Sequence, residues 1–285
     1  MSGISIGIQE TPEKLLEARR GQRGMAWPIV DGYVIPGDQY RLYESGRFND
    51  TPVLLGYNSD EGLSFTRVTK ADEYAAGVRE RYGPFADRLL AAYPAAGGAV
   101  TKTARDLARD SAFGWHTWSW ARLQSARGKG KVYYYYFDQH PPRTPGTPEA
   151  DHGTPHGVDV PYVFENLEGT ATAGDRHISE TMAAYWTNFA KRGDPNGEGV
   201  PAWPAFSDGN PVVMHLGPTA RTGHVPSADS LKVLDQYFAW KRSPEGSAAT
   251  TPPAEGVPAP TNVGSSRYPR ILPDNRVVFQ VRAPE

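Results

Sequence analysis

Two acidic residues and one histidine are the residues of this sequence whose types and surroundings suit chemistry. Asp60 and Glu61 lie side by side in a polar turn, Asn58-Ser-Asp-Glu-Gly62, and His156 follows a Pro- and Gly-rich segment later in the chain. A buried carboxylate that holds an imidazole can activate a hydroxyl nucleophile for acyl transfer. A solvated turn with a helix N-cap accounts for Asp60 and Glu61 equally well, so their types alone leave both interpretations open.

The strands that must position these residues are predicted from runs of apolar residues. Residues 52–55 form such a run, closed by Gly56, which predicts a buried strand that ends at the Asp60–Glu61 turn. Residues 131–137 are almost continuously aromatic, which predicts a second strand, buried on both faces of a parallel sheet. The carboxyl ends of strands in open α/β sheets are where ligands and catalytic groups collect.

Helices are predicted where apolar residues recur at helical spacing between Pro and Gly stops. These segments are residues 11–19, 70–82, 86–93, 104–126, 179–191 and 228–241. In the longest of them, Leu107, Phe113 and Trp115 are candidate buried positions. Residues 139–155 are rich in Pro and Gly, and they are predicted to form the loop that delivers His156.

The composition excludes several classes of partner and cofactor. The 285 residues carry a formal net charge of −2, which gives no electrostatic case for a nucleic acid or an anionic membrane surface. There is no cysteine, so disulfides and thiolate metal sites are excluded. His152 and His156 are four residues apart, but Gly153 and Pro155 between them prevent the helix that a His-x-x-x-His zinc site needs. No metal or cofactor, and no membrane, is therefore predicted.

Three segments carry a resemblance to a known family. They are Trp27-Pro-Ile-Val-Asp-Gly-Tyr-Val-Ile-Pro36, Thr51-Pro-Val-Leu-Leu-Gly-Tyr-Asn-Ser-Asp-Glu-Gly62 and His156-Gly-Val-Asp-Val-Pro-Tyr-Val-Phe164. Over roughly residues 10–242 the chain resembles the type-B carboxylesterase (cholinesterase-like) family of α/β-hydrolases. The resemblance implies that Glu61 and His156 are the acid and the base of a Ser-Glu-His triad that hydrolyses carboxylic esters through an acyl-serine intermediate.

The nucleophile of such a triad is the residue that this sequence does not supply convincingly. The family places its Ser in a Gly-x-Ser-x-Gly elbow between a strand and a helix, after a Gly-rich oxyanion loop. Gly3-Ile-Ser-Ile-Gly7 has that spacing, but no room precedes it for the strand that must aim Ser5. We therefore expect the carboxyl-terminal half of a larger esterase, inactive alone. Its expected partners are the missing amino-terminal half and a small-molecule or sugar ester.

The expected fold class is α/β, with three regions along the chain. Residues 1–242 are predicted to form part of an α/β-hydrolase fold, the carboxyl-terminal half of its sheet with its helices. Residues 243–266, rich in Pro, Ala, Gly, Ser and Thr, predict a flexible linker. Residues 267–285 predict one isolated strand, and they resemble the start of the early-set (CBM48-like) module of bacterial esterases.

The resemblance of the tail narrows the expected ester substrate, and the cholinesterase-like family also offers an alternative function. The tail implies a secreted or periplasmic parent protein that acts on feruloyl or acetyl esters of plant polysaccharides. Cholinesterase-like domains also occur as non-catalytic adhesion proteins, so a binding domain is the alternative function. Because adhesion members typically lose residues of the triad, the presence of both Glu61 and His156 favours an enzyme.

Overall fold

The structure, a computed structural model, describes most of the chain: residue 30 and residues 32–95, 98–147, 150–250, 257–258, 270–271 and 277–278. The chain divides into two compact units, residues 1–39 with 282–285 and residues 40–281. The helix predicted at residues 11–19 and the Gly3–Gly7 segment lie outside the described residues.

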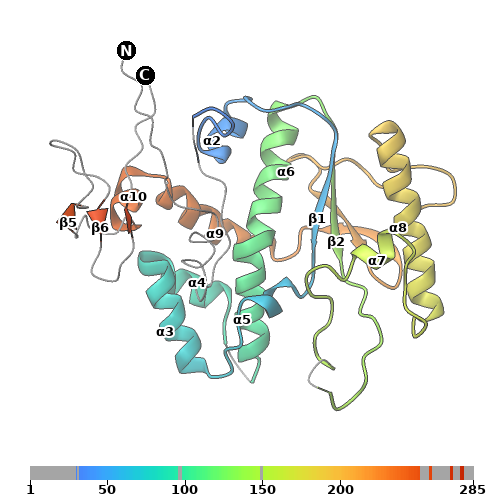
Figure 1. Ribbon diagram of the computed structural model, residues 1–285, viewed down its shortest axis with the longest axis horizontal. Coiled ribbons are helices and arrows are strands. Elements are labelled where there is room, and N and C mark those ends of the chain that lie inside the picture. The colour runs from blue at the N-terminus through green and yellow to red at the C-terminus, as the bar shows by residue number, and fades with distance from the viewer. Residues whose placement is uncertain are drawn as a thin grey trace, which may run out of the picture. The chain divides into compact units, whose positions relative to one another are not determined.

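A four-stranded sheet lies at the centre of the larger unit, with the strand order β1-β2-β3-β4 (Figure 1). Its strands are β1 (Val53–Asn58), β2 (Val132–Phe137), β3 (Val212–Leu216) and β4 (Ala220–His224). The first three strands are parallel, and β4 pairs antiparallel with β3. Both strands predicted from apolar runs are confirmed, and they are direct neighbours.

The side chains of β2 alternate between two hydrophobic cores, one on each face of the sheet. Val132 and Tyr134 belong to a core that includes residues of α3, α4, α5, α6 and α9. Tyr133 and Phe137 belong to a second core, which includes residues of α7 and α8. Figure 1 shows α6 and α8 on opposite sides of β1 and β2. The predicted burial of this strand on both faces is therefore confirmed.

Helices account for most of the remaining elements. They are α2 (Gln39–Glu44), α3 (Ala71–Tyr82), α4 (Ala86–Ala92), α5 (Val100–Arg109), α6 (Trp115–Arg127), α7 (Val160–Val163), α8 (Ala173–Arg192), α9 (Ala228–Lys241) and α10 (Pro244–Thr250), with 3₁₀ turns η1 (Glu61–Ser64) and η2 (Gly83–Phe85). The helix predicted from residue 179 begins at Ala173, because Thr172 and Asp175 form a capping box. Among the described residues, none of these helices has the length and apolar character needed to cross a bilayer.

The long helix predicted over residues 104–126 is interrupted in the middle. The helix α5 ends at Arg109 and α6 begins at Trp115, and a π-helical turn, η3 (Asp110–Gly114), joins them. A π turn widens the backbone spiral by one residue per turn, so it changes the direction of the side chains that follow. Sequence periodicity does not show such an insertion.

The carboxyl-terminal segment contains more regular structure than was predicted. The helix α10 lies inside the segment that was expected to be a linker. The short strands β5 (Val257–Pro258), β6 (Arg270–Ile271) and β7 (Val277–Val278) form an antiparallel sheet, so the predicted strand near residue 277 pairs with β6 and does not stand alone. The predicted domain boundaries at residues 242 and 266 stay predictions.

Candidate active site

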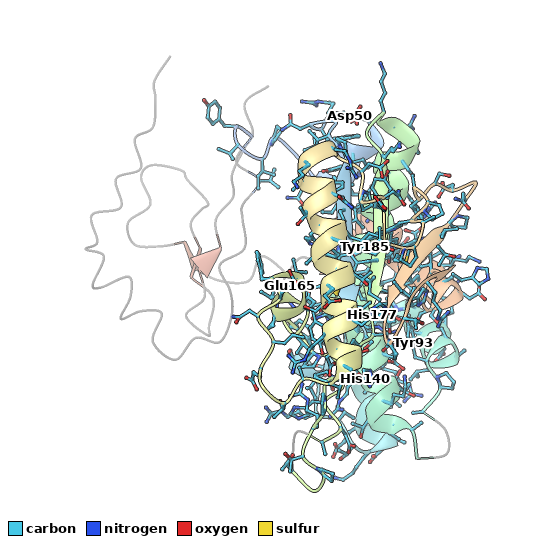
Figure 2. The ribbon with its side chains drawn as sticks, turned by 90° about the vertical axis from the view of Figure 1, so that its right-hand side faces the viewer. Asp50, Tyr93, His140, Glu165, His177 and Tyr185 are labelled. Atoms are coloured by element: carbon cyan, nitrogen blue, oxygen red, sulfur yellow. The ribbon has the colours of Figure 1, made fainter. Side chains whose placement is uncertain are left out.

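The predicted site residues lie at the edge of the sheet formed by the carboxyl ends of β1 and β2. The register pairs Asn58, the last residue of β1, with Phe137, the last residue of β2. Figure 2 separates the two edges: Asp50, which precedes β1, lies at one end of the sheet, and His140, which follows β2, lies at the other. The rule that polar residues after parallel strands converge therefore holds here.

Glu61 and His156, 95 positions apart in the sequence, are joined by a hydrogen bond. The distance between His156 Nδ1 and Glu61 Oε2 is 2.9 Å. Glu61 is 3% exposed, whereas the side chain of His156 is 65% exposed. Because a carboxylate only accepts, Nδ1 carries the proton in this hydrogen bond, and Nε2 of the neutral imidazole is then the nitrogen with a lone pair that can accept one. The structure brings the two predicted residues together in this way, and their catalytic roles stay predictions.

The carboxylate of Glu61 sits in an environment that disfavours its charge. Burial raises the pKa of Glu61 above its usual value, and the hydrogen bond from the backbone N–H of Asn58 and the attraction of His156 oppose this only in part. The Asn58 nitrogen lies 3.2 Å from Glu61 Oε1. Both oxygens of Glu61 therefore have partners, one on the strand and one on the imidazole.

We expect the Glu61 carboxyl to titrate above about 4.3, the usual value for glutamate. Between the unfolded and the folded pKa only the folded chain binds this proton. The free energy of unfolding should therefore decrease as the pH rises through that interval. Side-chain ¹³C NMR titration measures the pKa, with Glu61→Gln to assign the signal, and urea melts follow the stability. A Glu61 signal that titrates below about 4.3 would contradict the expected shift.

Asp60 holds the loop that carries His156 against the end of β1. Its backbone N–H donates to Thr154 O (3.1 Å), and its side-chain Oδ2 accepts from the Thr154 N–H (2.9 Å). Asp60 occupies the N-cap position of η1, but its side chain makes no capping hydrogen bond. The N-cap interpretation of this carboxylate is therefore wrong, because its acceptor is used by the distant loop.

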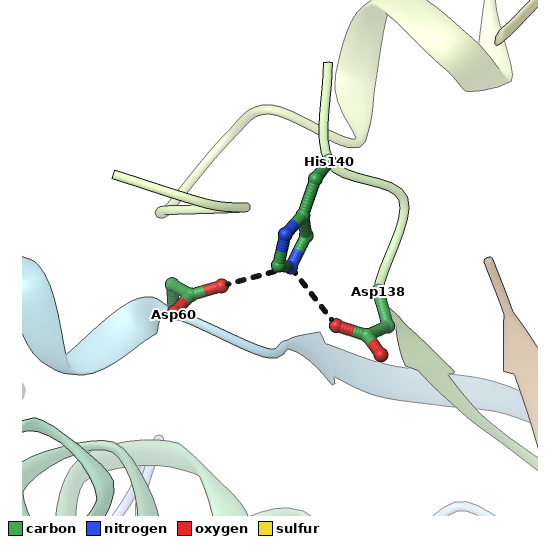
Figure 3. A group of neighbouring side chains, drawn as sticks. All are labelled: Asp60, Asp138 and His140. Carbon is green, nitrogen blue, oxygen red and sulfur yellow. Dashed lines mark hydrogen bonds and ion pairs between the residues drawn. The ribbon is translucent and has the colours of Figure 1, made fainter. Parts of the chain in front are cut away.

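His140 lies between two carboxylates at the same edge (Figure 3). Its Nε2 is 3.1 Å from Asp138 Oδ1 and 3.4 Å from Asp60 Oδ2. Within the described part of the chain, these three residues are the one group of His, Asp and Glu side chains close enough to share a metal ion. Asp60 Oδ2 already accepts from Ser59 Oγ (2.7 Å) and the Thr154 N–H. Hydrogen bonding therefore accounts for the arrangement without an ion.

A buried arginine fixes the turn from the opposite side. Arg109 is 5% exposed, and its Nη1 donates to Ser59 O over 3.1 Å. Its Nε donates to Asp110 Oδ1 over 2.8 Å, and Tyr93 Oη donates to Asp110 Oδ2 over 2.9 Å. A charge-assisted network of this kind leaves a buried carbonyl little freedom to move. The turn that carries Glu61 is thus held from α5 as well as from the His156 loop.

Gly62 is required because η1 packs directly on α5. A Cβ atom at this position would lie 1.8 Å from the carbonyl oxygen of Arg105. Gly62→Ala must therefore displace backbone, and we expect it to lower the free energy of unfolding by about 3 kcal/mol.

The matched control for that substitution is Gly77→Ala, because Gly77 lies in α3 with nothing within 4 Å of the added Cβ. A helical Gly→Ala change should raise stability by up to about 1 kcal/mol. Urea denaturation measures both variants. Equal stability of Gly62→Ala and wild type would contradict the tight packing of η1 on α5.

Several residues of the site were missed or misplaced from the sequence. Phe113, predicted as a buried helix position, lies with its ring centroid 5.3 Å from that of His156. It is placed there by the π turn, which leaves no signal in the sequence. Asp138 and His140 were not singled out from the sequence, but both lie just after the strand predicted over residues 131–137, and that position could have singled them out. His152 belongs to no group of described side chains that could share a metal ion.

Comparison with known proteins gives the family. The sequence profile of the carboxylesterase family matches residues 7–234. The fumonisin B1 esterase of Sphingopyxis macrogoltabida is 34% identical over 199 residues, which cover 63% of this chain and 35% of that protein. Human (Homo sapiens) neuroligin-2 is 31% identical over 200 residues, which cover 59% of this chain and 24% of that protein.

A solved structure gives the fold. PNB esterase superposes with a TM-score of 0.61 at 24% identity, over 79% of this chain and 49% of that one. The chain therefore has a partial α/β-hydrolase fold, as predicted. It spans about a third of the length of the fumonisin B1 esterase. Because the family profile matches most of its residues, the chain belongs to the carboxylesterase family.

Proposed function

We propose that this chain supplies the acid and the base of a serine-esterase triad. The observation that carries the proposal is the 2.9 Å hydrogen bond from His156 Nδ1 to the buried Glu61 carboxylate, at the carboxyl edge of the sheet. The opposite ring nitrogen, Nε2, faces away from Glu61 on a largely exposed side chain. A general base needs one ring nitrogen held by the carboxylate and the other accessible to the nucleophile and the substrate.

The chemistry assigned to the pair is acyl transfer in two steps. His156 Nε2 takes the proton of a serine hydroxyl as its oxygen attacks the ester carbonyl, and the imidazolium then gives that proton to the leaving alcohol. In the second step a water molecule attacks the acyl-serine with the same two proton transfers through His156, and the carboxylic acid product leaves. Glu61 holds the Nδ1–H tautomer and stabilises the imidazolium, and no metal or cofactor takes part.

We further propose that the serine and the oxyanion loop come from sequence outside these 285 residues. Within the described residues, no hydroxyl group is hydrogen-bonded to His156 Nε2, and Ser5 is not among those residues. The chain also covers a minor part of the relatives that it matches. On this proposal the chain alone has little or no esterase activity.

The open edge of β1 is the place where the missing part of the sheet would pair. Among the described strands β1 is an edge strand, and Val53–Asn58 contains neither a charged residue nor a proline. Edge strands that face solvent usually carry charges, prolines or bulges against association. An unprotected parallel strand therefore favours a further strand as its neighbour, and the missing amino-terminal half is the proposed partner.

The proposed substrate is a small-molecule or sugar ester. Phe113 lies beside His156, and Phe65, which is 55% exposed, packs on Phe113 with a centroid distance of 5.8 Å. Aromatic faces next to the base suit an aryl acyl group. A feruloyl or acetyl ester of a plant polysaccharide is the narrower proposal, and it rests on the resemblance of residues 267–285 to an early-set module.

A non-catalytic binding domain is the second candidate function, and the similarity to neuroligin-2 is the observation that keeps it. One assay distinguishes the two functions. It measures the hydrolysis of p-nitrophenyl acetate by this chain joined to an amino-terminal esterase segment. Rapid turnover supports the enzyme, whereas an assembled but inactive protein supports the binding domain.

A further inference from the structure

Asn58 contacts Glu61 and also the segment that carries His156. It is the last residue of β1 and is 1% exposed. Its backbone N–H donates to Glu61 Oε1, and its side-chain Nδ2 donates to Pro155 O (2.9 Å) and to Asp159 Oδ1 (3.0 Å). Pro155 directly precedes His156 and Asp159 follows it three residues later, so a single side chain ties both ends of the histidine segment.

The direction of these hydrogen bonds follows from the register of the sheet. The N–H groups of Val53 and Ser59 point toward β2 and donate to Lys131 O, just before β2, and to Phe137 O, at its end. Asn58 is out of phase with these two residues, so its N–H points away from β2 and reaches Glu61 instead. The strand end thereby fixes the carboxylate through the backbone and the histidine segment through the side chain.

The histidine segment is largely exposed, and Asn58 adds to the hold that Asp60 exerts on it through Thr154. The side chain of His156 is 65% exposed, and the next residue, Gly157, has φ +81°, a conformation that favours glycine. Both protons of the Asn58 amide are donated, one to Pro155 before His156 and one to Asp159 after it. An ionised aspartate or a leucine has a similar size but no donor, so neither can form these two hydrogen bonds.

We propose that Asn58 is a positioning residue that sets the imidazole of His156 on the Glu61 carboxylate. Its effect on ester hydrolysis rests on the proposed function, whereas its effect on the imidazole does not. Removing the two donors leaves Pro155 O and Asp159 Oδ1 without their partner. The segment then relaxes, and the Nδ1–H···Oε2 hydrogen bond lengthens or breaks.

The test is ¹⁵N NMR of the histidine rings in the full 285-residue chain, which reports the ring nitrogen that carries the proton. In the wild type we expect the neutral imidazole of His156 to be the Nδ1–H tautomer. Asn58→Asp keeps the size of the side chain and removes both donors. We expect it to lower the Nδ1–H fraction of His156 by roughly twofold or more.

The matched control is Asn188→Asp. Asn188 Nδ2 also donates to a proline carbonyl, Pro195 O, over 3.1 Å, but it lies on α8. That variant should leave the His156 tautomer unchanged. The double variant Asn58→Asp with Asp159→Asn restores one amide–carboxylate pair in the reverse direction, and it should recover part of the Nδ1–H fraction.

In an esterase assembled with the missing segment, Asn58→Asp should lower kcat by about 10²-fold with little change in KM, because the base is misplaced by about 1 Å. An unchanged His156 tautomer in the folded Asn58→Asp variant would overturn the proposal. If that variant does not fold, hydrogen exchange of the wild type is the test. Fast solvent exchange of the side-chain amide protons of Asn58 would also overturn the proposal. A tautomer shift without any esterase activity would refute the proposed function alone.

Discussion

Joined to an amino-terminal segment that carries a Gly-x-Ser-x-Gly elbow, this chain should hydrolyse p-nitrophenyl acetate at least about 10⁴-fold faster than it does alone. The reason is that triad residues act as a unit: an imidazole on a carboxylate has little effect until a serine hydroxyl lies at its Nε2. The part of the fumonisin B1 esterase that lies outside the match is a suitable donor, because that relative is 34% identical to this chain over the match.

The measurement needs evidence of assembly besides the rate. Size-exclusion chromatography of the co-expressed segments shows whether they form one particle. A fluorophosphonate, which labels activated serines, should label the donor segment and leave this chain unlabelled. Two results would contradict the proposal: rapid turnover by the 285-residue chain that is lost in Ser5→Ala, or an assembled particle that neither turns over ester nor reacts with the probe.

The parts of the fold that could be predicted are those in which local pattern and burial agree. The apolar run of β1 and the aromatic run of β2 are short, bounded by turn residues and buried on two faces, so periodicity and composition both indicate strands. The position of Glu61 after β1 then follows from the rule for strand ends. His156 reached the prediction through its motif, because no local rule relates residues 95 apart.

The parts that could not be predicted depend on tertiary contacts. The π turn Asp110–Gly114 sits in a continuous helical pattern, and it places Phe113 at His156 only because of the packing around it. The donor to the Asp60 carboxylate is the backbone N–H of Thr154, which has no side-chain signature in the sequence. Strand β4 has few apolar residues, and it forms because β3 offers it an edge.

The acid and the base of the pair are held to different degrees. Glu61 is held by the backbone of Asn58, by the packing of Gly62 on Arg105 and, through Ser59 O, by Arg109. The rigid side of the pair is therefore the acid, and the imidazole arrives on a more exposed loop. Substitutions of Gly62 or Arg109 should therefore act mainly through stability, whereas loss of the side-chain contacts that hold the His156 loop should act mainly through catalysis.

In the assembled esterase, His156→Ala and Glu61→Gln are each expected to lower kcat by about 10⁴- to 10⁶-fold, and the double variant no further than His156→Ala alone. Glu61 acts only through the imidazole, so it has nothing to orient once His156 is gone. The controls are His177→Ala and Glu180→Gln, the same two residue types at exposed positions on α8, and both should keep wild-type kcat. Additive losses in the double variant would mean that Glu61 acts on the reaction by a route independent of His156. A wild-type rate in His156→Ala would mean that another residue is the base, and the 2.9 Å contact would then be a structural hydrogen bond.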